Sequence, residues 1–224
     1  MEQIKEYLDI NTVNHTGIIN RIIEQNHYTS YLEIGVEKGN NFREIQCAVK
    51  VGVDPDPASK ATVHMTSDDY FVHIPENLQF DLIFVDGLHE WHQCYRDIIN
   101  GLRHLAPGGT IVCHDMGPLE EAWTCWPRGE QLIWCGNVYN ALIELQQNRR
   151  DVEVATLYNV DYGTAIIRKQ WMPQTYFDRL DLEKLDFGEW QKNMGQLMGA
   201  IPWEVFEPNF LRDNYWEHKF SEFI

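Results

Sequence analysis

The segment FDLIFV, residues 80–85, most constrains the fold, because it is almost wholly apolar and stops abruptly at Asp86. A strand of this kind is buried on both faces, as strands in the middle of a parallel sheet are. Parallel strands need a long crossover connection, which is usually a helix. The segment therefore predicts an α/β chain in which strands and helices alternate.

The rest of the chain has this alternation. Short apolar runs predict six more strands, over residues 31–36, 48–54, 61–66, 110–113, 152–157 and 163–168. Helical spacing of apolar residues predicts helices within residues 1–29 and over residues 91–105 and 138–148. We expect a doubly wound, mostly parallel seven-stranded sheet of the Rossmann-like type, with the last two strands as an antiparallel hairpin at its edge.

Residues 171–224 differ in character from residues 1–170, and we expect the domain boundary between them. This C-terminal extension is rich in aromatic residues, and prolines interrupt any long helix. It contains Trp171, Trp190, Trp203 and Trp216. Because disordered segments are poor in aromatic residues, the extension should pack on the domain or on a second subunit. A homo-oligomer is an expectation on this ground.

Charge excludes several classes of partner. The chain of 224 residues has 18 Lys and Arg against 34 Asp and Glu, a formal net charge of -16. Such a surface repels nucleic acid and anionic membranes.

The sequence has neither an apolar run of the roughly 20 residues that a membrane span needs nor a signal-peptide pattern at its start. With five cysteines and no CxxC pair, we expect reduced thiols and a cytoplasmic protein.

Polar residues follow the expected strands at the point where each strand ends. In an open parallel sheet, ligands bind at the carboxyl ends of the strands. Each residue alone could be a cap or a turn residue, but together they predict a ligand site. They are Glu33, Gly35, Gly39, Asp54, Ser67, Asp68, Asp86, His89, His114 and Asp115.

The first of these loops favours an adenosyl ligand without phosphates. Gly35 and Gly39 have the spacing GxxxG in place of GxGxxG, and Glu37 would repel a pyrophosphate. Asp54 ends the second strand, where a carboxylate accepts hydrogen bonds from ribose hydroxyls. The alternative for Asp54 is a turn residue in the sequence DPDP.

The order and spacing of these motifs resemble those of class I S-adenosylmethionine-dependent methyltransferases. More narrowly, residues 15–170 are similar to the branch that includes catechol-type and macrolide-sugar O-methyltransferases. Two departures stand out. Glu37 lies near the place of the central glycine of the usual first motif, and His114 precedes Asp115 where metal-dependent members carry two acidic or amide ligands.

The resemblance implies a role for each part of the cofactor site. Glu33 and the backbone from Gly35 to Gly39 would hold the amino-acid part of S-adenosylmethionine, and Asp54 the ribose. Ser67 and Asp68 would face the adenine, or they could cap a helix. Asp86 is expected to serve both the cofactor and a metal ion.

The resemblance also implies the reaction centre. A hydroxyl is a poor nucleophile until it loses its proton, so a divalent cation or a base assists methyl transfer to it. His89, three residues after Asp86, would be the base. Asp86 and Asp115 would bind Mg²⁺ or Mn²⁺. His114 either joins them as a softer ligand or only lines the pocket.

Residues 116–137 form a long loop with three tryptophans, which we interpret as a lid and an aromatic wall for the acceptor. Packing against another subunit is the alternative. The function expected is S-adenosylmethionine-dependent methylation of a small hydroxylated acceptor. The alternatives are an NAD-dependent oxidoreductase, which the missing GxGxxG disfavours, and a non-catalytic adenosyl-ligand-binding protein, which the presence of Asp86, His89 and Asp115 disfavours.

Overall fold

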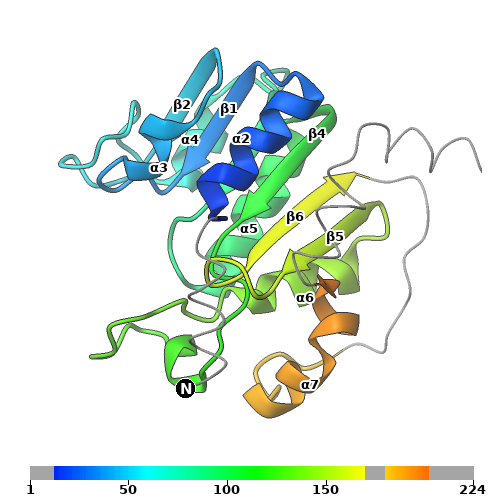
Figure 1. Cartoon of the computed structure of the whole chain (residues 1–224). Coiled ribbons are helices and arrows are strands. Elements are labelled where there is room, and N and C mark those ends of the chain that lie inside the picture. Colours follow the sequence, from blue (N-terminus) through cyan, green and yellow to red (C-terminus); the bar gives the residue numbers. More distant parts are fainter. Residues whose placement is uncertain (1–12, 170–179, 202–224) are drawn as a thin grey trace, which may run out of the picture.

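A computed structural model of the chain describes residues 13–169 and 180–201 (Figure 1). It contains a seven-stranded sheet in the order β2-β1-β3-β4-β6-β5-β7. Neighbouring strands run parallel except at β4–β6 and β5–β6, which are antiparallel. The predicted fold class is therefore confirmed. The strands are β1 Ser30–Ile34, β2 Val49–Val53, β3 Phe80–Val85, β4 Leu105–Cys113, β5 Val152–Leu157, β6 Thr164–Lys169 and β7 Ala200–Ile201.

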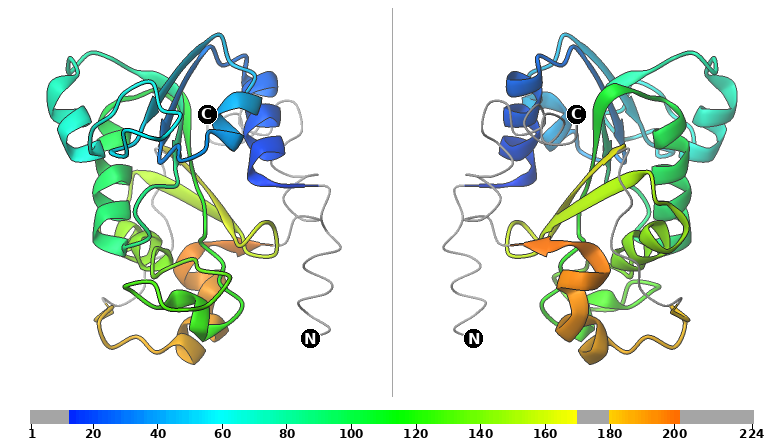
Figure 2. Two further views of the ribbon diagram at one scale, coloured as in Figure 1. Left: turned by 90° about the vertical axis from the view of Figure 1, so that its left-hand side faces the viewer. Right: turned by 90° about the vertical axis from the view of Figure 1, so that its right-hand side faces the viewer.

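Helices cover both faces of the sheet, as the two edge views in Figure 2 show. One face packs against α2, and the other packs against α4, α5, α6 and α7. Side chains of β3 alternate between the two cores, since Leu82 and Phe84 join α2 whereas Ile83 and Val85 join α5. The helices are α2 His15–Asn26, α3 Asn40–Glu44, α4 Ser67–His73, α5 Trp91–Arg103, α6 Tyr139–Asn148 and α7 Phe187–Met198.

Local sequence explains where two of these helices begin and which face they bury. The side chain of Asn14 caps α2 by accepting from the amide of Gly17, and Glu90 caps α5 by accepting from His92 and Gln93. The four isoleucines of α2 are all buried, as their spacing predicted.

One predicted strand was wrong. Residues 61–66 make a single bridge between Val53 and Val63, with no continuing ladder. The chain cannot continue as a strand there, because the side chain of Thr66 accepts from the amide of Asp69 and so begins α4. The seventh strand of the sheet is instead β7, which pairs with β5.

The part of the C-terminal extension that the structure describes packs against α6 and β5. Trp190 is buried with its ring 4.4 Å from that of Tyr139, and the hydroxyl of Thr156 donates to the carbonyl of Met198 at 2.7 Å. Trp171, Trp203 and Trp216 lie outside the described residues, so the domain boundary stays a prediction. None of the helices in the described ranges is both long and apolar enough to span a bilayer.

Register aligns the carboxyl ends of the four parallel strands. Ile34 pairs with Val53 and with Val85, and Val85 pairs with Cys113. The residue after each strand therefore lies at the same edge of the sheet. These residues are Gly35, Asp54, Asp86 and His114.

Gly35 permits a close contact between two of these strand ends. Its φ is +88°, and a β-carbon on it would lie 2.1 Å from the carbonyl oxygen of Asp86. Neither the backbone angle nor the space accommodates a side chain.

We predict that Gly35→Ala destabilises the protein more than Gly108→Ala does. Gly108 also has a positive φ, +76°, but nothing lies within 4 Å of the point that a β-carbon would occupy there. Gly108→Ala should cost about 1–2 kcal/mol of backbone strain, and Gly35→Ala should add a further ~1–3 kcal/mol or more from overpacking. Urea unfolding measures both. Equal losses would show that the contact with Asp86 relaxes without cost.

Candidate functional site

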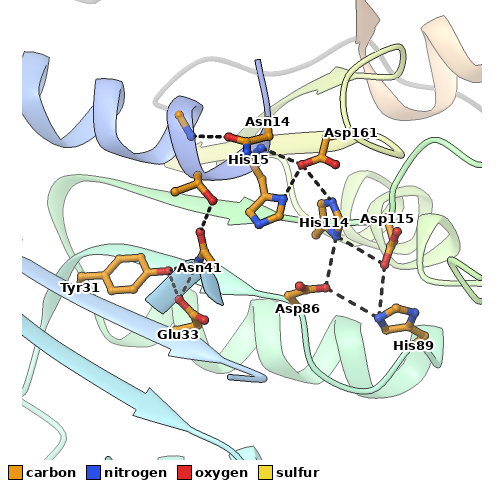
Figure 3. A network of polar contacts seen from close by, with 12 residues as sticks. Asn14, His15, Tyr31, Glu33, Asn41, Asp86, His89, His114, Asp115 and Asp161 are labelled. Atoms are coloured by element: carbon orange, nitrogen blue, oxygen red, sulfur yellow. Dashed lines mark hydrogen bonds and ion pairs between the residues drawn. The ribbon is translucent and has the colours of Figure 1, made fainter. Parts of the chain in front are cut away.

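Three side chains from the ends of β3 and β4 converge (Figure 3). The Nε2 atom of His89 lies 3.3 Å from Oδ2 of Asp115 and 3.7 Å from Oδ1 of Asp86. Asp115 is buried, and the side chains of Asp86 and His89 are 26% and 20% exposed. The sequence placed Asp86 and His89 on one loop and Asp115 on another, and the structure brings the three side chains together.

A backbone carbonyl fixes the tautomer of His89. Its Nδ1 lies 3.2 Å from the carbonyl oxygen of Trp134, which can only accept, so Nδ1 carries a proton and donates it. Nε2 therefore faces the two carboxylates. Burial alone lowers the pKa of His89, but the contacts with Asp86 and Asp115 outweigh burial and raise that pKa.

The chemistry of this group suits a cation. His89, Asp86 and Asp115 each offer one ligand atom, and these atoms lie within 4.8 Å of one another. Burial would raise the pKa of Asp86, but His114 and His89 outweigh it and lower that pKa, so the carboxylate stays ionised. A ring nitrogen that donates to a carbonyl through its other N–H is typical of histidine ligands.

His114 contacts this group and a second one. Its Nδ1 lies 3.4 Å from Asp86 and 3.5 Å from Asp115, while its Nε2 lies 3.6 Å from Asp161. Burial lowers the pKa of His114, but the carboxylates of Asp115 and Asp86 outweigh burial and raise it well above its usual value. The expected metal set of Asp86, His114 and Asp115 is thus close together, with His89 as an additional ligand candidate.

Sequence reasoning missed His15 and Asp161. Oδ2 of Asp161 accepts from the backbone amide of His15 at 2.9 Å and contacts its Nδ1 at 2.5 Å. The topology held a signal for Asp161, because β6 runs antiparallel to β4 and the turn before β6 must therefore lie beside the end of β4. Nothing in the sequence indicated that His15 lies there.

Asp54 shapes the glycine loop. Its Oδ2 accepts from the amides of Val36 at 3.0 Å and Glu37 at 2.8 Å, and its Oδ1 accepts from the amide of Asp56 at 2.9 Å. Glu37 has a φ of +47°, a conformation that usually belongs to glycine. Glu37, which departs from the glycine of the usual first motif, therefore keeps a glycine-like backbone conformation. The role of Asp54 in binding a ribose stays a prediction.

Ser67 and Asp68 open α4 and contact α5. The side-chain nitrogen Nε2 of Gln93 donates to the side-chain oxygens of Ser67, Asp68 and Asp97 at 3.1–3.2 Å. The side-chain cap of α4 is Thr66, so the expected capping role does not fall on Ser67 or Asp68. Burial raises the pKa of Asp97, which sequence reasoning also missed, to about 6.

Glu33 is buried among neutral polar groups. Its Oε2 accepts from the hydroxyl of Tyr31 at 2.5 Å and from the amide of Asn41 at 2.7 Å (Figure 3). Asn41 in turn accepts from the hydroxyl of Thr16 on α2 at 2.8 Å. Burial outweighs these hydrogen bonds and raises the pKa of Glu33 to about 7.

The predicted loop over residues 116–137 extends to residue 138, just before α6, and contacts His89; it contains one 3₁₀ turn at Glu121–Thr124. Trp134 stacks on the ring of His89 at 4.6 Å, and Trp126 stacks on Trp134 at 5.7 Å. Gly136 packs so tightly that a β-carbon there would lie 2.0 Å from the carbonyl oxygen of His89. The loop therefore places aromatic rings beside His89, whereas its role as a lid stays a prediction.

We predict that Glu33→Gln flattens the pH dependence of stability near neutrality. The pKa of Glu33 lies above its unfolded value of 4.5, so neutral Glu33 stabilises the fold below pH 4.5, and this contribution is lost as the pH rises through about 7. The free energy of unfolding of the variant, relative to the natural protein, should rise by roughly 2–3 kcal/mol between pH 5 and pH 8.

Urea unfolding at the two pH values measures this difference. Glu76→Gln, in the exposed segment before β3, is the matched control. A difference for Glu33→Gln that does not change with pH would mean that Glu33 is ionised at the same pH in the folded and unfolded states.

Comparisons with known proteins agree with the fold. A family model described as a methyltransferase domain matches residues 32–116, a span that includes every strand-end residue from Glu33 to Asp115. A sequence search of curated proteins gives no match.

Solved structures share the fold at low sequence identity. An O-methyltransferase from Bacillus cereus, in complex with S-adenosylhomocysteine, is 13% identical with a TM-score of 0.54, over 76% of this chain and 91% of that chain. The O-methyltransferase TomG from Streptomyces achromogenes, in complex with S-adenosylmethionine, is 14% identical with a TM-score of 0.52, over 69% and 79%. The S-adenosylhomocysteine-bound methyltransferase PaMTH1 of Podospora anserina is 17% identical with a TM-score of 0.53, over 69% and 77%.

The agreement between the sheet order, the matched domain and these structures leads to one assignment. Residues 32–116 match a family model described as a methyltransferase domain, and the chain has the fold of the class I S-adenosylmethionine-dependent methyltransferases.

Proposed function

We propose that the protein transfers a methyl group from S-adenosylmethionine to the hydroxyl of a small molecule, with help from a divalent cation. The observation that carries this proposal is the convergence of Asp86, His89 and Asp115 at the ends of β3 and β4. It combines two carboxylates for a hard cation with Nε2 of His89, which in this proposal accepts a proton and does not bind the cation.

The strand-end edge supports the cofactor part of the proposal. The glycine loop, Asp54 and Asp86 lie side by side there because the strands are in register. S-adenosylmethionine carries a sulfonium cation and no phosphate, so an acidic edge favours it over a dinucleotide. The three similar structures described above hold S-adenosylmethionine or S-adenosylhomocysteine.

His89 is suited to remove the acceptor proton. With its Nδ1 proton donated to Trp134, its Nε2 has a lone pair whenever the ring is neutral. The acceptor oxygen would form a bond to the methyl carbon as the carbon–sulfur bond breaks, and Nε2 would take the hydroxyl proton. A cation held by Asp86 and Asp115 would lower the pKa of that hydroxyl.

We predict that the protein binds S-adenosylhomocysteine and does not bind NAD. Asp54→Ala should weaken binding by roughly 1–3 kcal/mol, because ribose hydroxyls and loop amides would lose their acceptor. Calorimetry measures both, with Asp151→Ala as the control, since Asp151 pairs with Arg149 at the start of β5. Binding of NAD without either adenosyl compound would favour an oxidoreductase, and binding without turnover on any hydroxylated acceptor would favour a non-catalytic protein.

A second prediction separates the base from the cation. Once an acceptor is found, His89→Ala should lower kcat by roughly 10²–10⁴-fold and leave cofactor affinity almost unchanged. Because the pKa of His89 is raised, the rate should fall as the pH falls through that raised pKa, where the ring is protonated. The variant should lose this acid limb in a pH–rate profile.

Chelation should lower the rate of the natural protein as well, since the cation acts on the acceptor oxygen. The matched control is His92→Gln, because His92 is 54% exposed and pairs with Glu90 on the outside of α5. A rate that is insensitive both to His89→Ala and to chelation would contradict the proposed reaction centre.

A further inference from the structure

We propose that His15, His114 and Asp161 form a second metal site, suited to a borderline transition metal such as Zn²⁺ and distinct from the group of Asp86, His89 and Asp115. Each of the three residues offers one ligand atom, and these atoms lie within 4.8 Å of one another. The proposal goes beyond the methyl-transfer reaction and does not depend on it.

The three ligands come from distant parts of the chain. His15 is the first residue of α2, His114 follows β4, and Asp161 lies in the turn between β5 and β6 (Figure 3). The amides of Met116 and Gly117 donate to the carbonyls of Gly163 and Tyr162 at 2.9 and 2.8 Å, which holds this turn against the end of β4. The fold itself therefore brings the ligands together.

The donor set favours a transition metal over Mg²⁺. Two imidazoles and one carboxylate are a common ligand set for Zn²⁺ and related ions, whereas Mg²⁺ prefers oxygen ligands. Oδ2 of Asp161 lies 2.5 Å from Nδ1 of His15 and 3.6 Å from Nε2 of His114. Ligand atoms about 2 Å from a shared tetrahedral ion lie about 3.3 Å apart, so small side-chain movements suffice.

His114 has a nitrogen available for this ion. Its Nε2 is buried and has no hydrogen-bond partner among the described residues. Its contact with Oδ2 of Asp161, at 3.6 Å, is too long for a hydrogen bond, and coordination of an ion would satisfy this nitrogen. The other nitrogen, Nδ1, faces Asp86 and Asp115.

Packing orients both rings. The ring of His15 stacks on Phe84 at 5.3 Å and meets the ring of His114 edge-on at 4.4 Å. The side chains of His15 and Asp161 are each 20% exposed, and that of His114 is 11% exposed. Rigid, mostly buried ligands lose little conformational freedom when an ion binds.

The backbone at the third ligand is strained. Asp161 and Tyr162 both have positive φ, +48° and +61°, although neither is glycine. Such strain persists where the surrounding structure requires it, and here it occurs at the residue whose carboxylate contacts His15 and His114.

An ion at Nε2 of His114 would set the state of Nδ1. Coordination through Nε2 leaves the proton on Nδ1, which then points at Asp86 and Asp115. The second site would thus hold His114 as a neutral hydrogen-bond donor beside the reaction centre.

Cobalt absorption tests the proposal without any need for activity. Co²⁺ in a tetrahedral site with two imidazoles gives strong visible bands, whereas Co²⁺ in an octahedral, oxygen-rich site gives weak ones. We expect Co²⁺ to give strong bands with the natural protein, added Zn²⁺ to remove them, and calorimetry with Zn²⁺ to show a matching site. His15→Gln and Asp161→Asn should each abolish the bands and weaken this Zn²⁺ site by at least tenfold.

Two controls assign the signal. His89→Gln removes a ligand candidate of the other group and does not touch His15 or Asp161, so its bands should remain. His92→Gln removes an exposed histidine that contacts only one carboxylate residue, Glu90, among the ion pairs of the described residues, and it should change nothing. Circular dichroism and urea midpoints check that each variant is folded.

Three results would overturn the proposal. The first is the absence of strong cobalt bands in the natural protein, which would leave His15 and Asp161 as an ion pair. The second is full retention of the bands in folded His15→Gln and Asp161→Asn. The third is their loss in His89→Gln, which would assign them to the other group. Failure of methyl transfer alone, with the bands as expected, would count against the proposed function and not against this site.

Discussion

The structure depends on the alignment of four parallel strand ends. The register of these strands places four residues side by side, namely Asp54, Gly35, Asp86 and His114. Because Gly35 has no side chain, the loop after β1 can contact the loop after β3 at Asp86. All other parts of the site are arranged around this edge. The glycine loop is held by Asp54, and the loop over residues 116–138 contacts His89 through Trp134.

A balance of charge then determines what the edge can do. Asp86, Asp115 and Asp161 lie within a few ångströms of His89, His114 and His15. Carboxylates buried so close together need a positive charge between them, which protonated imidazoles or metal ions can supply. Protons and a bound metal ion would therefore compete for the same nitrogen atoms, and the protonation state of the three histidines would decide whether an ion can bind.

The sheet and the residues at its strand ends could be predicted from the sequence. Buried parallel strands have a distinctive apolar pattern, and ligand-binding residues in such sheets follow the strands directly. The pattern failed at residues 61–66, where a few β-branched residues resembled a strand but α4 begins immediately afterwards. It also failed for contacts between distant segments. The approach of His15 to Asp161, and of Gln93 to Ser67, depends on how helices settle on the sheet, and no local spacing encodes that.

The hydrogen bond from His89 to Trp134 would make the covering loop part of the proposed proton transfer. The acceptor that holds the proton on Nδ1 belongs to the same residue whose ring stacks on the imidazole. Displacement of Trp134 would therefore remove both the stacking partner and the group that fixes the tautomer. In the proposed reaction, entry of an acceptor past Trp134 would therefore be coupled to the position of the proton on His89, because displacing this residue would leave neither ring nitrogen with a fixed proton.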